Sequence, residues 1–355
     1  MEEMRMRRNL RRVIYAAILV FALVGTLSYV VFLQGNDFDG GTHRFFTISR
    51  GQTFFTVVDS LEAQGLIENR RWFMLASKVL GGTEHIRVGR YRFESGVSNT
   101  TIFESLRDGK NLVLISLTIS EGRRSRGIAK ILSLSLGIDS LRFARLVHER
   151  ASGTILGIQA ESLEGYLFPE TYSFHWQTDE SEIIKAMVRQ FELAFPDSLR
   201  ASTERLGWDM NEVVTMASII QGEAMMVDEM PRISGVYHNR LRKGMKLQAD
   251  PTIQFLIENG PRRVLYSDLA VKSPYNTYLY KGLPPGPVNN PGRVALLAAV
   301  YPESHDFLFF VADGTGRHQF TRTYAEHMRH VRLYRKMRNE MLSNEAENKK
   351  SLSVR

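Results

Sequence analysis

The chain of 355 residues contains no cysteine at all. This absence excludes disulfides, thiolate catalysis and cysteine-ligated zinc, and it leaves the redox state of the compartment open. Proline is missing from the first 168 residues, whereas all eleven prolines lie between Pro169 and Pro302. The change in composition predicts two regions. We place their boundary near residues 151–160, where small residues and glycines interrupt a helical pattern.

Two common ligand-binding motifs are also missing. Gly314-Thr315-Gly316 lacks both the next glycine and the strand-to-helix setting of a phosphate-binding loop. His318, His327 and His330 are close in sequence but form no His-Glu-x-x-His motif, and hydrogen-bonded or solvated histidines are commoner than metal ligands. We therefore expect neither a cofactor nor a metal ion. The net charge of +8 suits an anionic polymer, a membrane surface or a plain solvated basic surface.

One long run without charge lies near the N-terminus, from Val13 to Leu33. At a rise of ~1.5 Å per residue this run spans ~31 Å, enough to cross a bilayer core. A cleaved signal peptide would have a shorter apolar region followed by a small-x-small site, and residues 32–36 offer none. Five arginines precede the run and polar or acidic residues follow it, so the rule of positive charge inside places the N-terminus in the cytoplasm.

This topology predicts a single-pass anchor in the cytoplasmic membrane with the remaining chain outside, in the periplasm. Residues 1–12 are then a cytoplasmic tip, 13–33 the transmembrane helix and 34–42 a linker. A chain that lies outside the cytoplasm is also not expected to have a nucleic acid as its partner.

A strand-then-helix pattern begins after the linker and recurs along the first region. Phe46–Gly51 resembles Leu117–Gly122, and each segment precedes a helical pattern of apolar residues. A further strand at Val88–Phe93 and a helix at Ile102–Leu106 lie between them. We therefore predict a set of small β/α modules over residues 43–155.

The second region, residues 156–342, is predicted to be mostly helical. Helical patterns cover residues 180–195, 197–206, 211–226, 229–243, 293–300 and 323–342, with a strand at 307–312. Proline-rich loops separate them, and residues 343–355 are polar enough to fray as a tail. The fold class is thus α+β, with a transmembrane helix, β/α modules and a mixed, mostly helical domain whose cleft is built from loops.

Glu223 closely follows the apolar run Val213–Ile220 in this second region. It lies three residues after Ile220, four after Ile219 and seven after Met216, so a helix would place it on the core-facing side. Burial raises the pKa of a carboxyl group, and a carboxyl that stays protonated near neutral pH can donate a proton in glycosidic cleavage. The alternative is a structural glutamate that pairs with an arginine or caps a loop.

Several blocks around Glu223 resemble the YceG-like (MltG-type) endolytic murein transglycosylases, which cut peptidoglycan glycan strands at the cytoplasmic membrane. The resemblance rests on four sets of residues and covers nearly the whole chain: Leu163–Tyr172, Ala217–Glu223, Asn239–Leu241 with Leu247–Thr252, and Ser273–Pro287. The family's catalytic glutamate ends the Ser-Ile-x-x-x-Glu stretch, which implies that role for Glu223. The chain departs from the family pattern at Gln221-Gly222, where members carry a charged pair.

The resemblance implies a lytic reaction. The 6-hydroxyl of MurNAc attacks the anomeric carbon and leaves a 1,6-anhydro end, while Glu223 acts first as acid and then as base at the MurNAc-GlcNAc β-1,4 bond. It also implies that the modules are LysM-like, either binding glycan or spacing the catalytic domain from the membrane. Nascent peptidoglycan strands are the implied substrate, and cell-wall synthases are further partners.

Two other functions remain open from the sequence. A peptidoglycan hydrolase would need a second carboxylate, for which Glu164, Glu170 and Asp250 are candidates. A catalytically silent scaffold would bind wall-synthesis proteins instead. Candidate substrate-binding residues combine these acids with amides and aromatic rings that suit sugars. They are Glu164, Tyr166, Gln248, Asp250, Tyr275, Asn276, Tyr278 and Asn290, although Asn290 also suits a cap for the helix that follows it.

Overall fold

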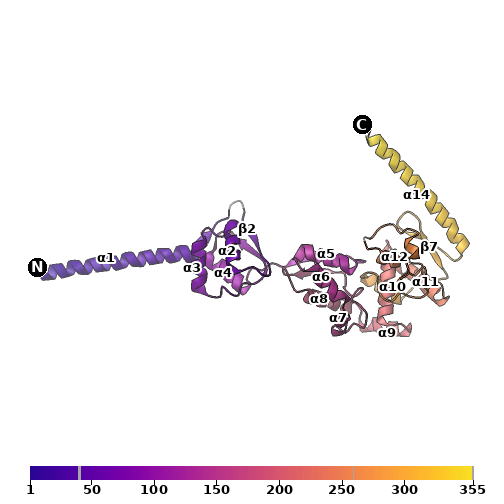
Figure 1. Ribbon diagram of the computed structural model, residues 1–355, viewed down its shortest axis with the longest axis horizontal. Coiled ribbons are helices and arrows are strands. Elements are labelled where there is room, and N and C mark those ends of the chain that lie inside the picture. Colours follow the sequence, from indigo (N-terminus) through magenta and orange to yellow (C-terminus); the bar gives the residue numbers. More distant parts are fainter. Residues whose placement is uncertain (39–40, 259, 354–355) are drawn as a thin grey trace. The chain divides into compact units, whose positions relative to one another are not determined.

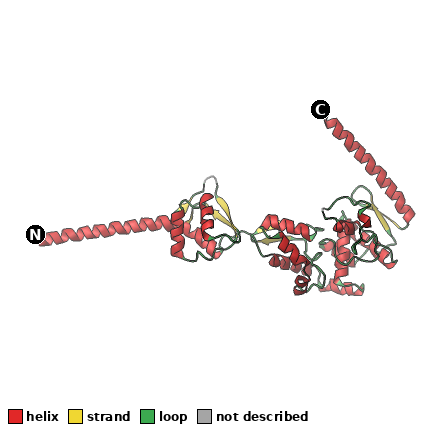
Figure 2. Cartoon of the chain, viewed as in Figure 1, coloured by secondary structure: helices red, strands yellow, loops and turns green. Residues whose placement is uncertain are grey.

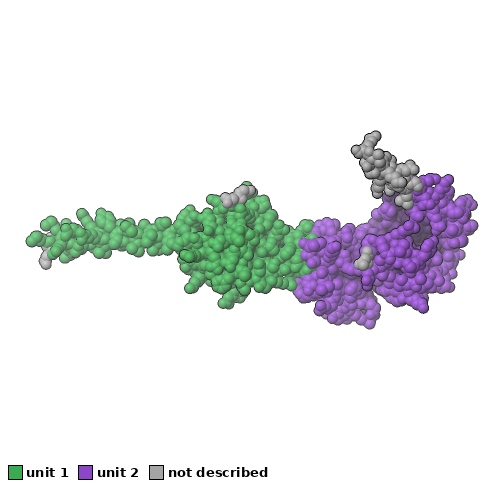
Figure 3. Space-filling model, turned by 45° about the horizontal axis from the view of Figure 1, so that its top comes forward, with its two compact units in different colours: residues 1–116, 135–138, 173–178 green, residues 117–134, 139–172, 179–355 purple. Residues whose placement is uncertain are grey.

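The computed structural model describes residues 1–38, 41–258 and 260–353. The chain forms two compact units (Figure 3). Unit 1 comprises Met1–Ser116, Ser135–Ile138 and Ser173–Thr178, and unit 2 comprises Leu117–Leu134, Asp139–Tyr172 and Asp179–Arg355. The division therefore comes near residue 116, earlier than the boundary that the proline distribution predicts. One reason is that helix α7 (Arg150–Ile155) covers the segment that the sequence suggests is a break.

Unit 1 starts with a long helix, α1 (Glu2–Ser28), which continues into a π-helical turn, η1 (Tyr29–Leu33) (Figure 1). Residues Met4–Leu33 are long and apolar enough to cross a membrane, in agreement with the predicted span. The end of this helix is anchored in the unit. Val31 is buried, and its carbonyl accepts a hydrogen bond of 3.0 Å from Asn99 Nδ2.

In the predicted linker, residues 34–42, the part up to Phe38 belongs to the folded unit. Strand β1 (Gly35–Asn36) pairs with β4 (Val97–Ser98). Asn36 is buried, and its amide donates to the carbonyl of Val97 at 2.9 Å. Phe38 belongs to the hydrophobic core. Hydrogen bonds and apolar contacts with distant residues therefore order residues 35–38, although their own sequence resembles a loop.

The rest of unit 1 follows the order strand, helix, helix, strand, helix. Strand β2 (His43–Ile48) pairs antiparallel with β3 (Gly89–Glu94), and Phe46 lies opposite Tyr91. Helices α2 (Phe54–Ala63), α3 (Arg70–Leu80) and α4 (Asn99–Asp108) pack against the pair and are capped by Thr53, Asn69 and Ser98. The predicted strand at Val88–Phe93 thus completes the first strand's pair rather than starting a separate module.

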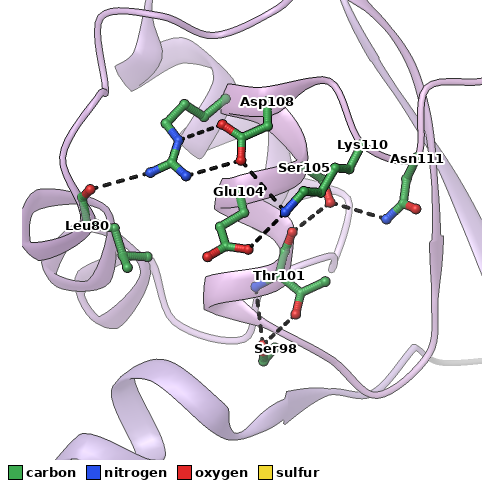
Figure 4. Close-up of polar contacts among 9 residues, drawn as sticks. Leu80, Ser98, Thr101, Glu104, Ser105, Asp108, Lys110 and Asn111 are labelled. Carbon is green, nitrogen blue, oxygen red and sulfur yellow. Dashed lines mark hydrogen bonds and ion pairs between the residues drawn. The ribbon is translucent and has the colours of Figure 1, made fainter.

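Polar contacts connect the two ends of α4 to its surroundings (Figure 4). At the start, Ser98 Oγ accepts a hydrogen bond of 3.2 Å from the Thr101 amide. At the end, the Arg107 guanidinium pairs with Asp108 at 2.8 Å and also donates to the carbonyl of Leu80, which ends α3. These contacts fix α4 beside α3.

In the second copy of the predicted repeat, strand β5 (Ile115–Thr118) pairs with β6 (Thr171–Phe174) and not with a strand of its own module. Helices α5 (Ser125–Leu136), α6 (Ser140–His148) and α7 lie between the two strands in the chain. The repeat therefore extends only to the order of strand and helix along the chain, because the strands of the two copies pair in different ways.

Unit 2 continues as a mostly helical body with small strands (Figure 2). Its further elements are α8 (Glu180–Ala194), α9 (Asp197–Arg205), α10 (Met210–Glu223), η2 (Val227–Glu229), α11 (Met230–Arg242), α12 (Asp250–Leu256), η3 (Asp268–Ala270), α13 (Arg293–Val300), β7 (Phe309–Ala312), β8 (His318–Thr321) and α14 (Tyr324–Ser353). The sequence patterns predict most of these helices but not α12. Helix α14 continues to Ser353, through most of the predicted polar tail.

Helix α10 lies at the centre of the part of unit 2 that carries the candidate site. All eight residues of Val213–Ile220 are buried, and the helix packs against α11, α12 and α13. A capping box starts it, in which Asp209 accepts from the Glu212 amide and Glu212 accepts from the Asp209 amide. A helix buried on all sides is held rigidly, so its last residue has a well-defined position.

Candidate active site

Glu223 is the last residue of α10 and is partly exposed. The sequence predicts that it shares the buried face of the helix. The structure instead places it just beyond the buried run, where Ala224 leaves the helical conformation. The C-terminal end of a helix carries a partial negative charge, which disfavours an ionised carboxylate. This position therefore combines access to solvent with an environment that favours the protonated acid.

Two hydrogen-bond donors face the Glu223 carboxyl group. Tyr237, from α11, donates from Oη to Glu223 Oε1 at 2.7 Å. Its ring is buried and packs edge to face against Phe310, with 5.8 Å between the ring centroids. The backbone amide of Asp250, at the start of α12, is the second donor. The carboxyl group thus lies where the ends or faces of α10, α11 and α12 meet.

The balance of these groups sets the protonation of Glu223. Although part of the residue is exposed, burial of its carboxyl group raises the pKa to about 7, and the nearby Asp250 carboxylate acts in the same direction. The hydrogen bonds from Tyr237 and the Asp250 amide, together with the charge of Arg240, limit the rise. A carboxyl group with a pKa near neutral can give up a proton and take one back at the same pH, which is the requirement for an acid that later acts as base.

Asp250 and Tyr278 form a second pair next to Glu223. Tyr278 Oη donates to Asp250 Oδ1 at 2.6 Å, and burial followed by this carboxylate raises the pKa of the tyrosine. Gln248 is exposed two residues before Asp250 and has a left-handed backbone with φ of 51°. Such a conformation is uncommon outside glycine and often marks a functional loop. Two of the predicted binding residues, Asp250 and Tyr278, therefore lie near Glu223, and Gln248 is close to them along the chain.

Sequence reasoning missed two residues of this group, Tyr237 and Arg240. They are three residues apart on α11 and so share one face of that helix. Arg240 is buried, and its guanidinium donates to the carbonyls of Leu247 and Leu308 at 2.6 and 2.7 Å. It thereby fixes the segment that leads to Asp250. The signal available in the sequence was a tyrosine and an arginine at helical spacing in the block that follows Glu223.

Gln221 and Gly222, directly before Glu223, both take part in packing. A Cβ atom on Gly222 would lie 2.7 Å from side-chain carbons of Pro251. Gln221 Oε1 accepts a hydrogen bond of 3.0 Å from the Gly292 amide. The glycine therefore allows α12 to approach α10 closely, and the helix runs on to Glu223 without a break.

We expect Gly222→Ala to destabilise the protein by about 1 to 3 kcal/mol, because the added methyl group would overlap Pro251. The displacement of α12 would also weaken the bond from the Asp250 amide to Glu223. Thermal unfolding and cleavage assays would measure both effects. Gly127→Ala on α5 is the matched control, because its Cβ meets nothing within 4 Å and it should be neutral or stabilising. Equal behaviour of the two variants would contradict this account of Gly222.

Glu164 and Asn290 are buried together, and their polar atoms bond to the protein interior. Glu164 accepts hydrogen bonds from the Ser125 amide at 2.9 Å and from Asn290 Nδ2 at 2.9 Å. Asn290 Oδ1 in turn accepts from the amides of Gly165 and Leu167, both at 2.9 Å. The geometry gives both side chains a structural role, and the cap predicted for Asn290 is not its function here. Their contact with substrate stays a prediction.

The other predicted binding residues also lie in packed surroundings. Tyr166 is buried, donates from Oη to Asn211 Oδ1 at 3.2 Å and packs against Phe191. Asn276 is fully buried and holds its own loop by donating to the carbonyls of Leu269 and Val271. Tyr275 is partly exposed and packs on Phe255, with 4.7 Å between ring centroids.

His318 and His327 are engaged in other contacts. His318 Nδ1 lies 2.9 Å from Glu229 Oε2, and the His327 ring stacks on Phe309. Over residues 1–38, 41–258 and 260–353, no group of three or more His, Asp or Glu side chains could hold a metal ion.

We expect Tyr237→Phe to move the alkaline limb of the activity profile to higher pH. The hydroxyl hydrogen bond holds the pKa of Glu223 down, so its loss raises that pKa and keeps the acid protonated for longer. The rate at the optimum should fall by about tenfold, because the carboxyl group loses its orientation. Tyr172→Phe is the control, since its buried hydroxyl bonds to the carbonyl of Phe168 instead. An unchanged pH profile in the Tyr237 variant would contradict this role.

The Glu223 carboxyl group, with its raised pKa and its two hydrogen-bond donors where three helices meet, has the features of a candidate acid–base site. The family follows from comparison. Residues 46–333 match the model of the YceG-like family, and the chain belongs to that family.

Curated relatives and a solved structure agree with this assignment. The chain is 29% identical to an endolytic murein transglycosylase of Bacillus subtilis (strain 168) over 87% of its own length and 89% of that protein. It is 26% identical to an endolytic murein transglycosylase of Streptococcus pneumoniae (strain D39), and the match covers 82% of this chain but 59% of that longer protein. A crystal structure of a YceG-like protein from Listeria monocytogenes shares 28% identity with a TM-score of 0.59, covering 81% of this chain and 98% of that chain.

Proposed function

We propose that this protein is a membrane-anchored endolytic transglycosylase of peptidoglycan. It would cleave the MurNAc-GlcNAc β-1,4 bond within glycan strands and leave 1,6-anhydroMurNAc ends. The observation that carries the proposal is the Glu223 carboxyl group, whose pKa is raised to about 7 and which accepts a hydrogen bond from Tyr237 Oη. The names of the relatives support the substrate.

In the proposed mechanism Glu223 works twice. The protonated carboxyl group donates to the glycosidic oxygen as the bond to the anomeric carbon breaks, and the GlcNAc unit leaves with that proton. The resulting carboxylate is stabilised by Tyr237 and by the Asp250 amide. It then accepts the proton of the MurNAc 6-hydroxyl while that oxygen bonds to the anomeric carbon. Water is not consumed, and the acid returns to its first state.

Hydrolysis is the second candidate, and one observation favours it. Asp250 is close enough to raise the pKa of Glu223, so it could act as the second carboxylate of a hydrolase. Tyr278, however, donates to Asp250 Oδ1 at 2.6 Å and occupies one of its oxygens. We therefore assign Asp250 and Tyr278 to substrate orientation, together with the exposed Gln248.

Unit 1 would attach the chain to the membrane. The apolar helix ending at Leu33 supports a single-pass anchor, and the preceding arginines support a cytoplasmic N-terminus with unit 2 outside. The order β2, α2, α3, β3 with one antiparallel pair supports one LysM-like module, which could bind glycan or act as a spacer. The second copy pairs differently and supports no further module. Cell-wall synthases remain proposed partners.

Mass spectrometry of the products from purified glycan strands tests the proposal. The full chain in detergent should produce internal cuts that bear 1,6-anhydroMurNAc ends. Reducing ends would show hydrolysis instead and would direct attention to Asp250. The absence of cleavage under all conditions would favour the scaffold.

A further inference from the structure

The end of the predicted membrane span is built into unit 1. Val31 and Phe32 belong to the uncharged run, yet the Val31 carbonyl accepts from Asn99 and the Phe32 carbonyl accepts from Thr100 Oγ1 at 2.8 Å. Both donors lie in the first turn of α4. Residues that touch the last turn of a spanning helix must lie at the level where that helix leaves the hydrocarbon, so this side of unit 1 has to meet the membrane surface.

Helix α3 is the element beside this exit point. It contacts η1 directly, and Gln34, just after η1, reaches Glu68 just before α3. Figure 1 shows α3 at the edge of unit 1 from which α1 emerges, lying across the end of α1, whereas β2 lies on the far side of the unit. An α-helix across the end of a membrane span would lie along the bilayer surface.

The two faces of α3 differ in the manner of an interfacial helix. Phe73, Ala76 and Ser77 are buried and point into unit 1. On the opposite side, Leu75 and Val79 are 41% and 66% exposed. Since α3 lies on the side of the unit where α1 emerges, the side opposite its buried face is turned toward the membrane.

Basic and aromatic residues accompany this apolar face. Arg71 and Lys78 are exposed at helical spacing with Leu75 and Val79, and Trp72 is partly exposed beside them. Long basic side chains can extend to lipid headgroups while their stems cover apolar surface, and tryptophan favours the membrane interface. The apolar surface continues onto α2 through Phe55, which is 58% exposed and helps line a groove of about 380 Å³ with Leu75.

We propose that α3 lies in the headgroup region of the leaflet at which the α1 span ends, with Leu75 and Val79 facing the lipid. The ligand of this surface is the phospholipid bilayer, and an interfacial helix of this kind inserts its apolar side to about 5 to 10 Å. The inference rests on the proposed membrane anchor and goes beyond it, because a simple anchor would leave unit 1 in water. Unit 1 would then have one fixed face on the membrane rather than rotate freely about a tether.

The absence of cysteine allows a direct test, since a single cysteine can be placed and labelled at will. Full-length Val79→Cys, labelled with the environment-sensitive dye NBD, is placed in nanodiscs of phosphatidylethanolamine and phosphatidylglycerol. We expect a blue-shifted emission and its loss when the lipids carry doxyl quenchers. Phe45→Cys on β2, an exposed apolar position at 42% accessibility, is the matched control and should show neither effect.

A third label separates the possible failures. Leu23→Cys lies within the span and should be quenched whenever α1 crosses the bilayer. Quenching at position 23 but not at 79 would overturn the α3 inference and leave the anchor intact. Failure of quenching at both positions would overturn the anchor and the inference together. The double variant Leu75→Asp/Val79→Asp, labelled at Lys78→Cys, should lose the quenching that Lys78→Cys alone shows, while a persistent signal would contradict a role for these apolar side chains.

Discussion

Glu223→Gln is expected to lower the rate of glycan-strand cleavage by about 10² to 10⁴-fold. Glutamine cannot donate the proton that the leaving oxygen needs, yet its amide oxygen can still accept from Tyr237 Oη. The variant should therefore keep the packing of the site while it loses the acid. The release of 1,6-anhydroMurNAc ends from purified strands, quantified by mass spectrometry, measures the effect.

The control for this variant is Glu170→Gln. Glu170 is an exposed carboxylate and one of the three candidates for a second acid, and its Oε1 accepts a hydrogen bond of 2.8 Å from the amide of Thr171. We expect its replacement to leave the rate unchanged. A Glu223→Gln variant that cleaves at the original rate would exclude the proposed acid and would favour a scaffold or another catalytic residue.

Glu223→Gln should also stabilise the fold at alkaline pH. The pKa of Glu223 rises from 4.5 to about 7 on folding, so its contribution to stability is complete below pH 4.5 and is lost as the pH rises through 7. Above pH 7 the native state holds an unfavourable carboxylate, which glutamine removes. Glu223→Gln should therefore be more stable than the original chain at pH 8 by about 1 to 3 kcal/mol, and closer to it at pH 4.5. Unfolding at both pH values tests this difference.

Asn290→Ala is expected to lower the free energy of unfolding by about 3 to 5 kcal/mol. The change removes the acceptor for the Gly165 and Leu167 amides and a donor to Glu164, all in a fully buried site. Each buried polar group left without a partner costs about 1 to 3 kcal/mol. Urea unfolding of the full chain in detergent measures the loss through a lower midpoint at a similar m-value.

Gln248→Ala provides the comparison, because both residues are predicted to bind substrate but Gln248 is exposed. Its stability should change by less than about 0.5 kcal/mol, whereas its KM for strands should rise. If Asn290 acted mainly on the substrate, its alanine variant would instead keep its stability and resemble Gln248→Ala. The pair of variants thus distinguishes a structural amide from a binding amide.

Local patterns in the sequence were sufficient to predict much of the fold. The membrane-length helix, the buried helix before Glu223 and the helices on either side of it all follow from apolar spacing within a short window. The position of Glu223 at the very end of α10 was harder to predict, because helix ends depend on the residues that pack beyond them. The helical continuation of α14 was missed because polar composition alone suggests fraying, although Glu, Lys and Ala favour helices.

The site itself depends on contacts between residues far apart in the chain. Tyr237 reaches Glu223 from the next long helix, and Tyr278 reaches Asp250 across 28 residues. No periodic pattern encodes such approaches. Polar side chains in the proline-rich loops were also harder to interpret, because buried loops leave backbone groups that side chains must satisfy. Asn276 meets that need in unit 2 while looking, in sequence, like a ligand for sugar.

The segment after the proline-rich loop is attached along the side of α10. The Val288 amide donates to Ser218 Oγ, Asn289 Nδ2 donates to the Ser218 carbonyl, and the Gly292 amide donates to Gln221. Since Ser218 lies in the buried stretch of α10, the amide proton of Val288 should exchange with solvent as slowly as those of that stretch. The segment of residues 288–292, beside Glu223, is therefore not a lid. The segment would separate from α10 only when that helix unfolds. A glycan strand would therefore have to enter and leave the site without displacing it.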